Sequence, residues 1–110
     1  MIGNKLTTGP FTFENGARLE SIDIAYHTSC PSYDGKRGVV WICHALTANS
    51  DCEDWWPDMV GSGKLIDTDK YFVACVNMLG SPYGSSGPAS SILKPDAPIC
   101  FHFRRLRYAI

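Results

Sequence analysis

Two short stretches of uninterrupted apolar residues organise the middle of the chain. They are "VVWIC" at positions 39–43 and "YFVACVNML" at positions 71–79, and both are rich in β-branched and aromatic residues. Apolar runs that lack polar alternation are typical of strands covered on both faces, as in a parallel sheet. The pattern therefore predicts two buried neighbouring strands.

The segment between the two runs predicts a crossover that contains a short helix. The sequence "WWPDMV" at 55–60 places Pro57 where a first helical turn tolerates proline, and Gly61 follows as an end signal. Parallel strands joined by a partly helical crossover indicate the α/β class.

Upstream, alternation around an Asn-Gly pair predicts a β-hairpin. Residues 11–13 (Phe-Thr-Phe) precede a turn at 14–16 (Glu-Asn-Gly), and the apolar residues Ile22, Ile24 and Tyr26 then alternate with other residues. This is a strong short-range hairpin signal. We expect one face of each strand to be buried and the other to be solvated.

The stretch "GSPYGSSGPASS" at 80–91 has two open interpretations. Its glycine, serine and proline content favours a flexible linker. Tyr83, and the position directly after a predicted buried strand, favour an ordered loop beside an active site.

Composition narrows the functional classes. The chain has 110 residues, enough for one small domain, and it is 45% hydrophobic and 19% charged, as in globular proteins. A net charge of −1 points to neither nucleic acid nor an anionic membrane. No apolar run approaches the roughly 20 residues that span a bilayer, and the first residues lack the apolar core of a secretory signal.

The five cysteines favour reduced thiols in a cytoplasmic protein. Their number is odd and no two have C-x-x-C spacing, which argues against a disulfide framework and against a zinc knuckle. Cys43 and Cys75 lie inside the apolar runs, so we expect them to be small core residues.

Common catalytic motifs are incomplete. "GSGK" at 61–64 is not a phosphate loop, because Asp58 and Leu65 occupy the places of a required glycine and a required serine or threonine. "GSSGP" at 84–88 fails as a nucleophile elbow because Pro88 replaces the second glycine. His27, His44 and His102 lack metal-ligand spacing, and no complete Ser-His-Asp set is assigned.

A longer constellation is more informative than these fragments. Its elements are Cys43-His44-Ala45-Leu46-Thr47, then Asp54-Trp55-Trp56, Gly63-Lys64, 67–72 (Asp-Thr-Asp-Lys-Tyr-Phe), and finally Asn77 followed by 80–88. In this order and spacing they resemble the N-terminal part of homoserine O-acetyltransferases, which are α/β-hydrolase-fold acyltransferases of methionine biosynthesis. The resemblance covers residues 10 to 95.

The resemblance implies the N-terminal portion of an α/β-hydrolase fold: an antiparallel hairpin that leads into a mostly parallel, incomplete sheet. "VVWIC" matches the third strand, and His44 to Thr47 match the loop that supplies one oxyanion-hole N–H, the backbone amide of Leu46. The resemblance makes His44 a residue that shapes the loop. It is not the base, since the triad histidine comes last in this fold's chain order.

The implied reaction is ping-pong transfer of acetyl from acetyl-CoA to the L-homoserine hydroxyl by a Ser-His-Asp triad. The family needs no metal or bound cofactor, since acetyl-CoA is a co-substrate. Its expected partners are these small molecules and a second subunit, without nucleic acid or membrane. The nucleophile, acid and base lie downstream in the family. We therefore expect the 110 residues alone to be inactive and "VVWIC" to leave an unpaired edge where a fifth strand belongs.

The last residues depart from the resemblance. We divide the chain into residues 1–95, the α/β-hydrolase portion, and residues 96–110, a non-family tail. Read in another frame, the codons of "FRRLRYAI" at 103–110 permit Phe-Pro-Thr-Thr-Thr-Ile-Arg-Asp-Met, which is the family's continuation. The hypothesis is a frameshifted gene fragment. The alternative is a true amphipathic C-terminal segment.

Three other functions stay open. In the first, the full protein is another α/β-hydrolase such as an esterase. In the second, it transfers succinyl instead of acetyl to homoserine. The third possibility is a non-catalytic module that pairs with a full-length homologue through its exposed strand.

Overall fold

The computed structural model describes residues 1–87 and Ser90, so the predicted tail at 96–110 lies outside the described residues. The elements in chain order are β1 (Ile2–Thr7), β2 (Phe11–Thr12), β3 (Arg18–Leu19), β4 (Asp23–Thr28), β5 (Gly38–Ile42), α1 (Cys52–Trp55), β6 (Val60–Gly61), β7 (Ile66–Asp67) and β8 (Tyr71–Val76). None of the helices in this part of the chain is long and apolar enough to cross a bilayer.

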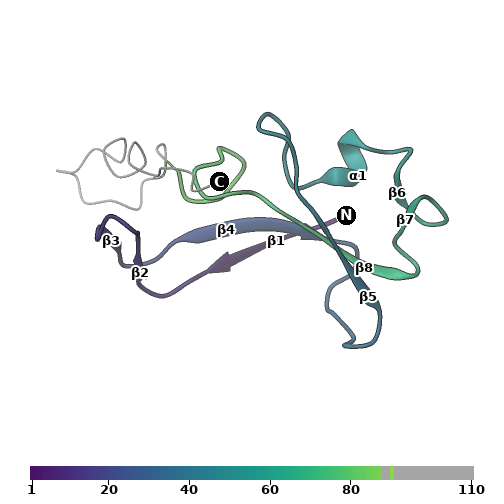
Figure 1. Cartoon of the computed structure of the whole chain (residues 1–110), viewed down its shortest axis with the longest axis horizontal. Coiled ribbons are helices and arrows are strands. Elements are labelled where there is room, and N and C mark those ends of the chain that lie inside the picture. Colours follow the sequence, from purple (N-terminus) through teal and green to yellow (C-terminus); the bar gives the residue numbers. More distant parts are fainter. Residues whose placement is uncertain (88–89, 91–110) are drawn as a thin grey trace.

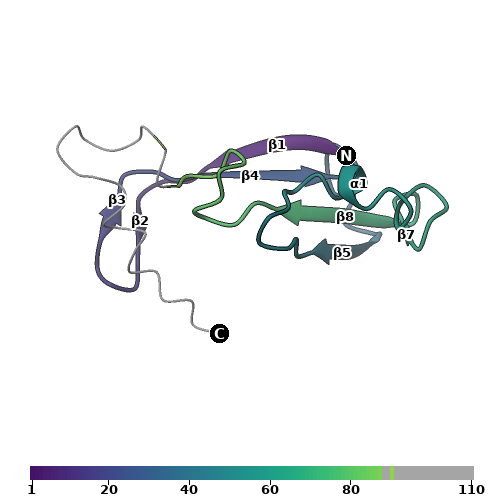
Figure 2. The same cartoon turned by 90° about the horizontal axis from the view of Figure 1, so that it is seen from above.

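A four-stranded mixed sheet with the order β1-β4-β8-β5 forms the body of the molecule (Figures 1 and 2). β1 and β4 are antiparallel, β4 and β8 are antiparallel, and β8 and β5 are parallel. The predicted parallel pair is therefore confirmed. The sheet begins antiparallel and becomes parallel, as expected for the N-terminal portion of an α/β-hydrolase.

The predicted hairpin is only partly correct. β2 and β3 pair around the Asn-Gly turn, where Gly16 has φ 82° and the Ala17 N–H donates to Asn15 Oδ1 at 3.0 Å. Ile24 and Tyr26, however, belong to β4, which pairs with β1 over six residue pairs. The local turn signal was right. The partner of β4, however, is β1 at the start of the chain, where the apolar pattern is weak.

One face of the β5–β8 pair carries the larger core. Ile42, Val73 and Cys75 lie on it and are buried against Cys52 of α1 and Val60 of β6. The crossover between the two strands thus covers this face, as parallel connections do.

β5 itself departs from the prediction of a strand buried on both faces. Val39 and Trp41 are 53% and 61% exposed, because β5 is the edge strand of the described sheet and their face has little cover. The expectation of two core cysteines holds for Cys75, but Cys43 is exposed just beyond the end of β5.

The helix of the crossover begins earlier than predicted. It covers Cys52–Trp55. Trp56, with φ −130° and ψ 49°, is no longer helical. Pro57 therefore follows the helix and does not start it, because proline disfavours helical geometry in the residue before it. Residues 57–59 instead form a turn, and Val60 and Gly61 form β6, which pairs in parallel with β7.

Candidate active site

The loop after β5 makes a tight turn at the carboxyl edge of the sheet. The chain leaves the strand after Ile42, and the Ala48 N–H donates to the Ala45 carbonyl at 3.0 Å. Leu46 and Thr47 are the central residues of this turn, and Leu46 is 95% exposed. The turn therefore leaves Leu46 almost fully exposed to solvent.

The amide of Leu46 is an available donor. A four-residue turn uses the N–H of its last residue, not that of its second. Among residues 1–87 and Ser90 the Leu46 N–H has no hydrogen-bond partner. A backbone donor fixed at a strand end can stabilise negative charge that develops on a carbonyl oxygen.

His44 is bonded within its own loop. Its Nδ1 lies 2.8 Å from the Ala45 carbonyl oxygen, and because a carbonyl only accepts, Nδ1 carries the hydrogen. Its Nε2 is buried without a partner in the described part of the chain. Within residues 1–87, neither a serine nor a carboxylate is bonded to His44, so the geometry fits a residue that shapes the loop.

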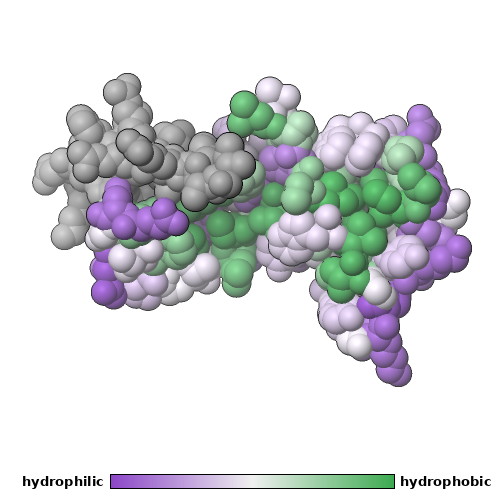
Figure 3. All heavy atoms as spheres, in the orientation of Figure 1, coloured by the Kyte–Doolittle hydropathy of each residue, from purple (hydrophilic) through white to green (hydrophobic). Residues whose placement is uncertain are grey.

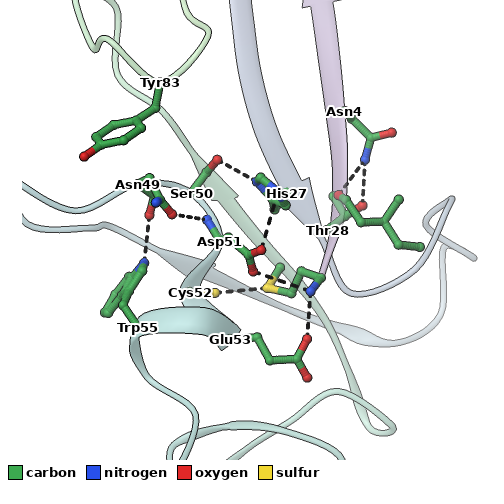
Figure 4. Close-up of polar contacts among 12 residues, drawn as sticks. Asn4, His27, Thr28, Asn49, Ser50, Asp51, Cys52, Glu53, Trp55 and Tyr83 are labelled. Atoms are coloured by element: carbon green, nitrogen blue, oxygen red, sulfur yellow. Dashed lines mark hydrogen bonds and ion pairs between the residues drawn. The ribbon is translucent and has the colours of Figure 1, made fainter.

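The fold brings together a serine, a histidine and an aspartate that sequence reasoning did not combine (Figure 4). His27 Nδ1 lies 2.7 Å from Ser50 Oγ, and its Nε2 lies 3.8 Å from Asp51 Oδ2. Ser50 is fully buried, so a substrate cannot reach its hydroxyl. The cluster ties the segment before α1 to β4. Only the pairing of β4 with β8 brings His27 next to it, so no sequence spacing revealed it.

Asn49 connects the turn at residues 45–48 to the helix α1. Its Oδ1 accepts the Asp51 N–H at 2.8 Å, and its carbonyl accepts the indole N–H of Trp55 at 2.9 Å (Figure 4). Trp55 in turn stacks on Trp56 with ring centroids 5.5 Å apart. Trp55 therefore holds the loop before α1 through Asn49, and Trp56 packs on Trp55.

The Gly/Ser-rich segment after β8 is an ordered loop over its described residues. Ser86 donates its N–H to the Asp23 carbonyl at 2.7 Å, and its hydroxyl accepts the Asp23 N–H at 2.8 Å. Ser85 Oγ accepts the Ala25 N–H at 3.0 Å and donates to the Asn77 carbonyl at 2.7 Å. These bonds decide between the two interpretations in favour of the ordered loop.

Sterics explain why position 84 of this loop is a glycine. Gly84 has φ 96°, and a Cβ there would lie 3.0 Å from the Cβ of Ala25. Asn77 holds the same loop from below, because its Nδ2 donates to the Tyr83 carbonyl at 2.7 Å. The loop thus packs at the end of β8, the strand next to β5, whose end leads into the turn at residues 45–48.

The "GSGK" segment is a turn held by a carboxylate. Asp67 Oδ1 accepts the N–H groups of Gly63 and Asp69, each at 3.0 Å, and Oδ2 pairs with Lys70 at 3.2 Å. The Gly63 and Asp69 amides, then Lys70, lower the pKa of Asp67. The Asp67 carboxylate accepts the Gly63 N–H, which a phosphate loop would offer to a phosphate, so this segment is structural.

Two buried cysteines, Cys52 and Cys75, are neighbours. A hydrogen bond between the thiols of Cys52 and Cys75 lowers the pKa of Cys52, while that bond and burial raise the pKa of Cys75. Among the residues described, no group of three or more His, Cys, Asp or Glu side chains is arranged to hold a metal ion.

Comparison with known proteins identifies the relationship. No protein-family profile matches the chain. The homoserine O-acetyltransferase of Sulfurimonas autotrophica is 47% identical over 92 residues, which covers 76% of this chain and 25% of that protein. The chain is homologous to part of the homoserine O-acetyltransferases. It spans 15% to 25% of the length of the curated relatives it matches.

Solved structures give the same fold. Homoserine O-acetyltransferase from Bacillus anthracis superposes with a TM-score of 0.68 at 29% identity, over 88% of this chain and 30% of that one. Esterase E22 superposes with a TM-score of 0.69 at 24% identity, over 88% of this chain and 30% of that one, which shows the shared α/β-hydrolase fold alone. The predicted resemblance to homoserine O-acetyltransferases and the predicted α/β-hydrolase fold are thereby confirmed.

Proposed function

We propose that this chain contributes one half of the oxyanion hole of a homoserine O-acetyltransferase. In the complete enzyme a serine takes acetyl from acetyl-CoA and passes it to the hydroxyl of L-homoserine, with an aspartate-oriented histidine moving the proton. The backbone N–H of Leu46 then stabilises the tetrahedral oxyanion in both half-reactions. The assignment of the matched relatives as homoserine O-acetyltransferases supports this choice of substrates.

The observation that carries the proposal is the position of the Leu46 amide. It lies in the turn directly after a parallel edge strand, and no described residue uses it. In α/β-hydrolases one oxyanion donor comes from this loop, and the other follows the nucleophile. The residues described here contain the first donor and no accessible nucleophile paired with a histidine. We therefore propose that the 110 residues alone do not turn over.

The cellular setting follows from the same assignment. The enzyme acts in methionine biosynthesis in the cytoplasm, where cysteines such as Cys43 stay reduced. It has no bound cofactor or metal, acetyl-CoA serves as co-substrate, and the complete enzyme is a homodimer. The exposed thiol of Cys43 fits this compartment.

Activity of a completed enzyme tests the substrate assignment. Residues 1–87 of this chain replace the matching part of the Bacillus anthracis enzyme, and release of free CoA is measured with L-homoserine and acetyl-CoA. We expect homoserine-dependent CoA release. Hydrolysis of p-nitrophenyl acetate without transfer to homoserine would overturn the proposal and favour an esterase, and use of succinyl-CoA in preference to acetyl-CoA would overturn the choice of donor.

The frameshift hypothesis for 96–110 also remains a proposal, since these residues lie outside the described part. Sequencing the DNA beyond codon 110 tests it. We expect an acyltransferase continuation in another frame, and its absence would overturn the hypothesis.

A further inference from the structure

Two buried thiols are neighbours in the core between α1 and β8. Cys52 is the first residue of α1 and Cys75 lies in β8, and both are fully buried in the cluster that includes Ile42. A hydrogen bond joins the two thiols, and Cys52 Sγ donates to Met1 Sδ at 3.0 Å (Figure 4). Neither thiol has a role in the proposed acyl transfer.

The two thiols lie at the two ends of the loop formed by residues 43–51. The loop leaves β5 after Ile42, whose register partner on β8 is Cys75, and it ends where Cys52 begins α1. The backbone N–H of His44, near the start of the loop, also donates to the Cys75 thiol. A covalent bond between the two sulfurs would therefore hold the two ends of this loop together.

The thiols differ in reactivity as disulfide formation requires. The hydrogen bond with Cys75 lowers the pKa of Cys52, whereas the same bond and burial raise the pKa of Cys75. Because the thiolate is the reactive form, Cys52 is the sulfur that reacts first with an oxidant.

The surroundings of the pair favour a small neutral oxidant. Figure 3 shows apolar residues gathered on the half of the molecule where Figure 1 places α1 and β8. Charged reagents are costly to bring into an apolar core, whereas hydrogen peroxide is small and uncharged. Since α1 has only four residues, its local opening gives peroxide a route to Cys52.

We infer that Cys52 and Cys75 form a redox-modification site, at which hydrogen peroxide produces a disulfide that holds the ends of loop 43–51 together. The inference stands apart from the proposed function, since this chemistry involves neither acetyl-CoA nor homoserine. In a reducing compartment such a disulfide is transient, so the free thiols of the structure are the resting state.

The reaction balances with peroxide as the only oxidant. The Cys52 thiolate attacks one peroxide oxygen, so an S–O bond forms, the O–O bond breaks, and hydroxide leaves and takes up the thiol proton as water. The Cys75 sulfur then attacks the Cys52 sulfur. The S–S bond forms, the S–O bond breaks, and the departing hydroxide takes the Cys75 proton as a second water. Two electrons pass from the two sulfurs to the peroxide.

Peptide mapping of the full 110-residue chain tests the chemistry. The reduced chain is treated with a small molar excess of hydrogen peroxide, and the remaining thiols are blocked with iodoacetamide in urea. A protease that cleaves after aspartate and glutamate leaves each of the five cysteines in its own peptide, so every disulfide is assigned by mass. We expect the Cys52–Cys75 link as the main product. A main product that contains Cys30 or Cys43, or sulfoxide at Met1 with both thiols free, would overturn the inference.

Hydrogen exchange measured by NMR tests the effect on the loop. The Ala48 N–H donates to the Ala45 carbonyl and the Asp51 N–H donates to Asn49 Oδ1, so both amides report opening of the loop. A crosslink removes conformations in which the ends of the loop separate. We expect these amides to exchange at least about fivefold more slowly in the oxidised chain than in the reduced chain. Unchanged or faster exchange would overturn the inference.

Matched variants connect the two effects. Cys52→Ala removes the attacking thiol and keeps a small apolar side chain in the core, so peroxide should no longer slow exchange in the loop. Cys30→Ala, at a cysteine outside the core cluster, should keep both the link and the slower exchange. Loss of the peroxide response in both variants would overturn the inference. If Cys52→Ala does not fold, Cys75→Ala gives the same comparison, and the peptide map of the unsubstituted chain decides in either case.

Discussion

Ser86 and Asp23 exchange two hydrogen bonds although they lie 63 positions apart in the sequence. The Ser86 N–H donates to the Asp23 carbonyl at 2.7 Å, and the Asp23 N–H donates to Ser86 Oγ at 2.8 Å. The bonds fix the loop that follows β8 against the start of β4. The Gly/Ser-rich loop is thereby bonded to the sheet at the end where β8 finishes.

Replacing Ser86 should destabilise the chain measurably. Ser86→Ala leaves the Asp23 N–H without its acceptor, and an unsatisfied, partly buried amide costs about 1–3 kcal/mol. Urea unfolding measures the change. Ser81→Ala is the matched control, since its hydroxyl accepts an exposed, longer bond of 3.3 Å, and it should change stability by under about 0.5 kcal/mol. Equal effects would contradict the role of the Ser86 bonds.

The contact between His27 and Ser50 should contribute to stability and not to chemistry. His27→Ala leaves the fully buried Ser50 hydroxyl without its partner, which should lower the free energy of unfolding by about 1–3 kcal/mol. Ser50→Ala and the double variant complete a double-mutant cycle measured by urea unfolding. We expect a coupling energy of about 0.5–3 kcal/mol. A coupling energy near zero would show that the bond does not hold the loop to β4.

The parallel strand pair and the α/β class could be predicted from the sequence, because "VVWIC" and "YFVACVNML" carry the apolar pattern that a sheet interior requires. The exposure of β5 could not be predicted in the same way. Val39 and Trp41 are exposed because β5 is the edge strand of the described sheet, and the apolar pattern of a strand does not say whether the strand lies at an edge. The same logic explains Cys43, which lies in an apolar run but is exposed.

Other features depended on contacts that no local signal contains. The Asn-Gly turn closes only the short β2–β3 pair, and β4 then pairs with β1 over six residue pairs that no local signal indicates. The Ser50–His27 bond joins residues 23 positions apart across two elements. The end of the helix was open to prediction, since Pro57 disfavours helical geometry at Trp56; its start was not marked by a cap, because the side chain of Asp51 at the N-cap makes no capping hydrogen bond.

Asp67 should make stability depend on acid pH. Its pKa is lower when folded than the ordinary value of 3.8, because the Gly63 and Asp69 amides and Lys70 favour the carboxylate. Its contribution is therefore present above about pH 4 and is lost as the pH falls through the folded pKa. Asp67→Asn should flatten this loss in urea unfolding between pH 5 and 2. An unchanged slope would contradict the assignment.

The cysteines should differ in their reaction with iodoacetamide. Cys43 is exposed, whereas Cys75 is buried and its pKa is raised by the thiol of Cys52 and by burial. Since the thiolate is the reactive form, Cys43 should be alkylated at least about tenfold faster than Cys75. Peptide mapping by mass spectrometry follows both sites. The rates should converge in 8 M urea. Equal rates in the folded chain would contradict the structure.

The central claim is that the amide of Leu46 stabilises an oxyanion. Leu46→Pro removes the N–H at a turn position where proline is favoured, while Leu46→Ala keeps the N–H and removes the exposed side chain. In the completed enzyme described above, circular dichroism first establishes that both variants fold, and kcat for acetyl transfer is then measured. We predict a loss of about 10²–10³ in kcat for Leu46→Pro and less than about tenfold for Leu46→Ala. Wild-type kcat in the folded proline variant would contradict the account.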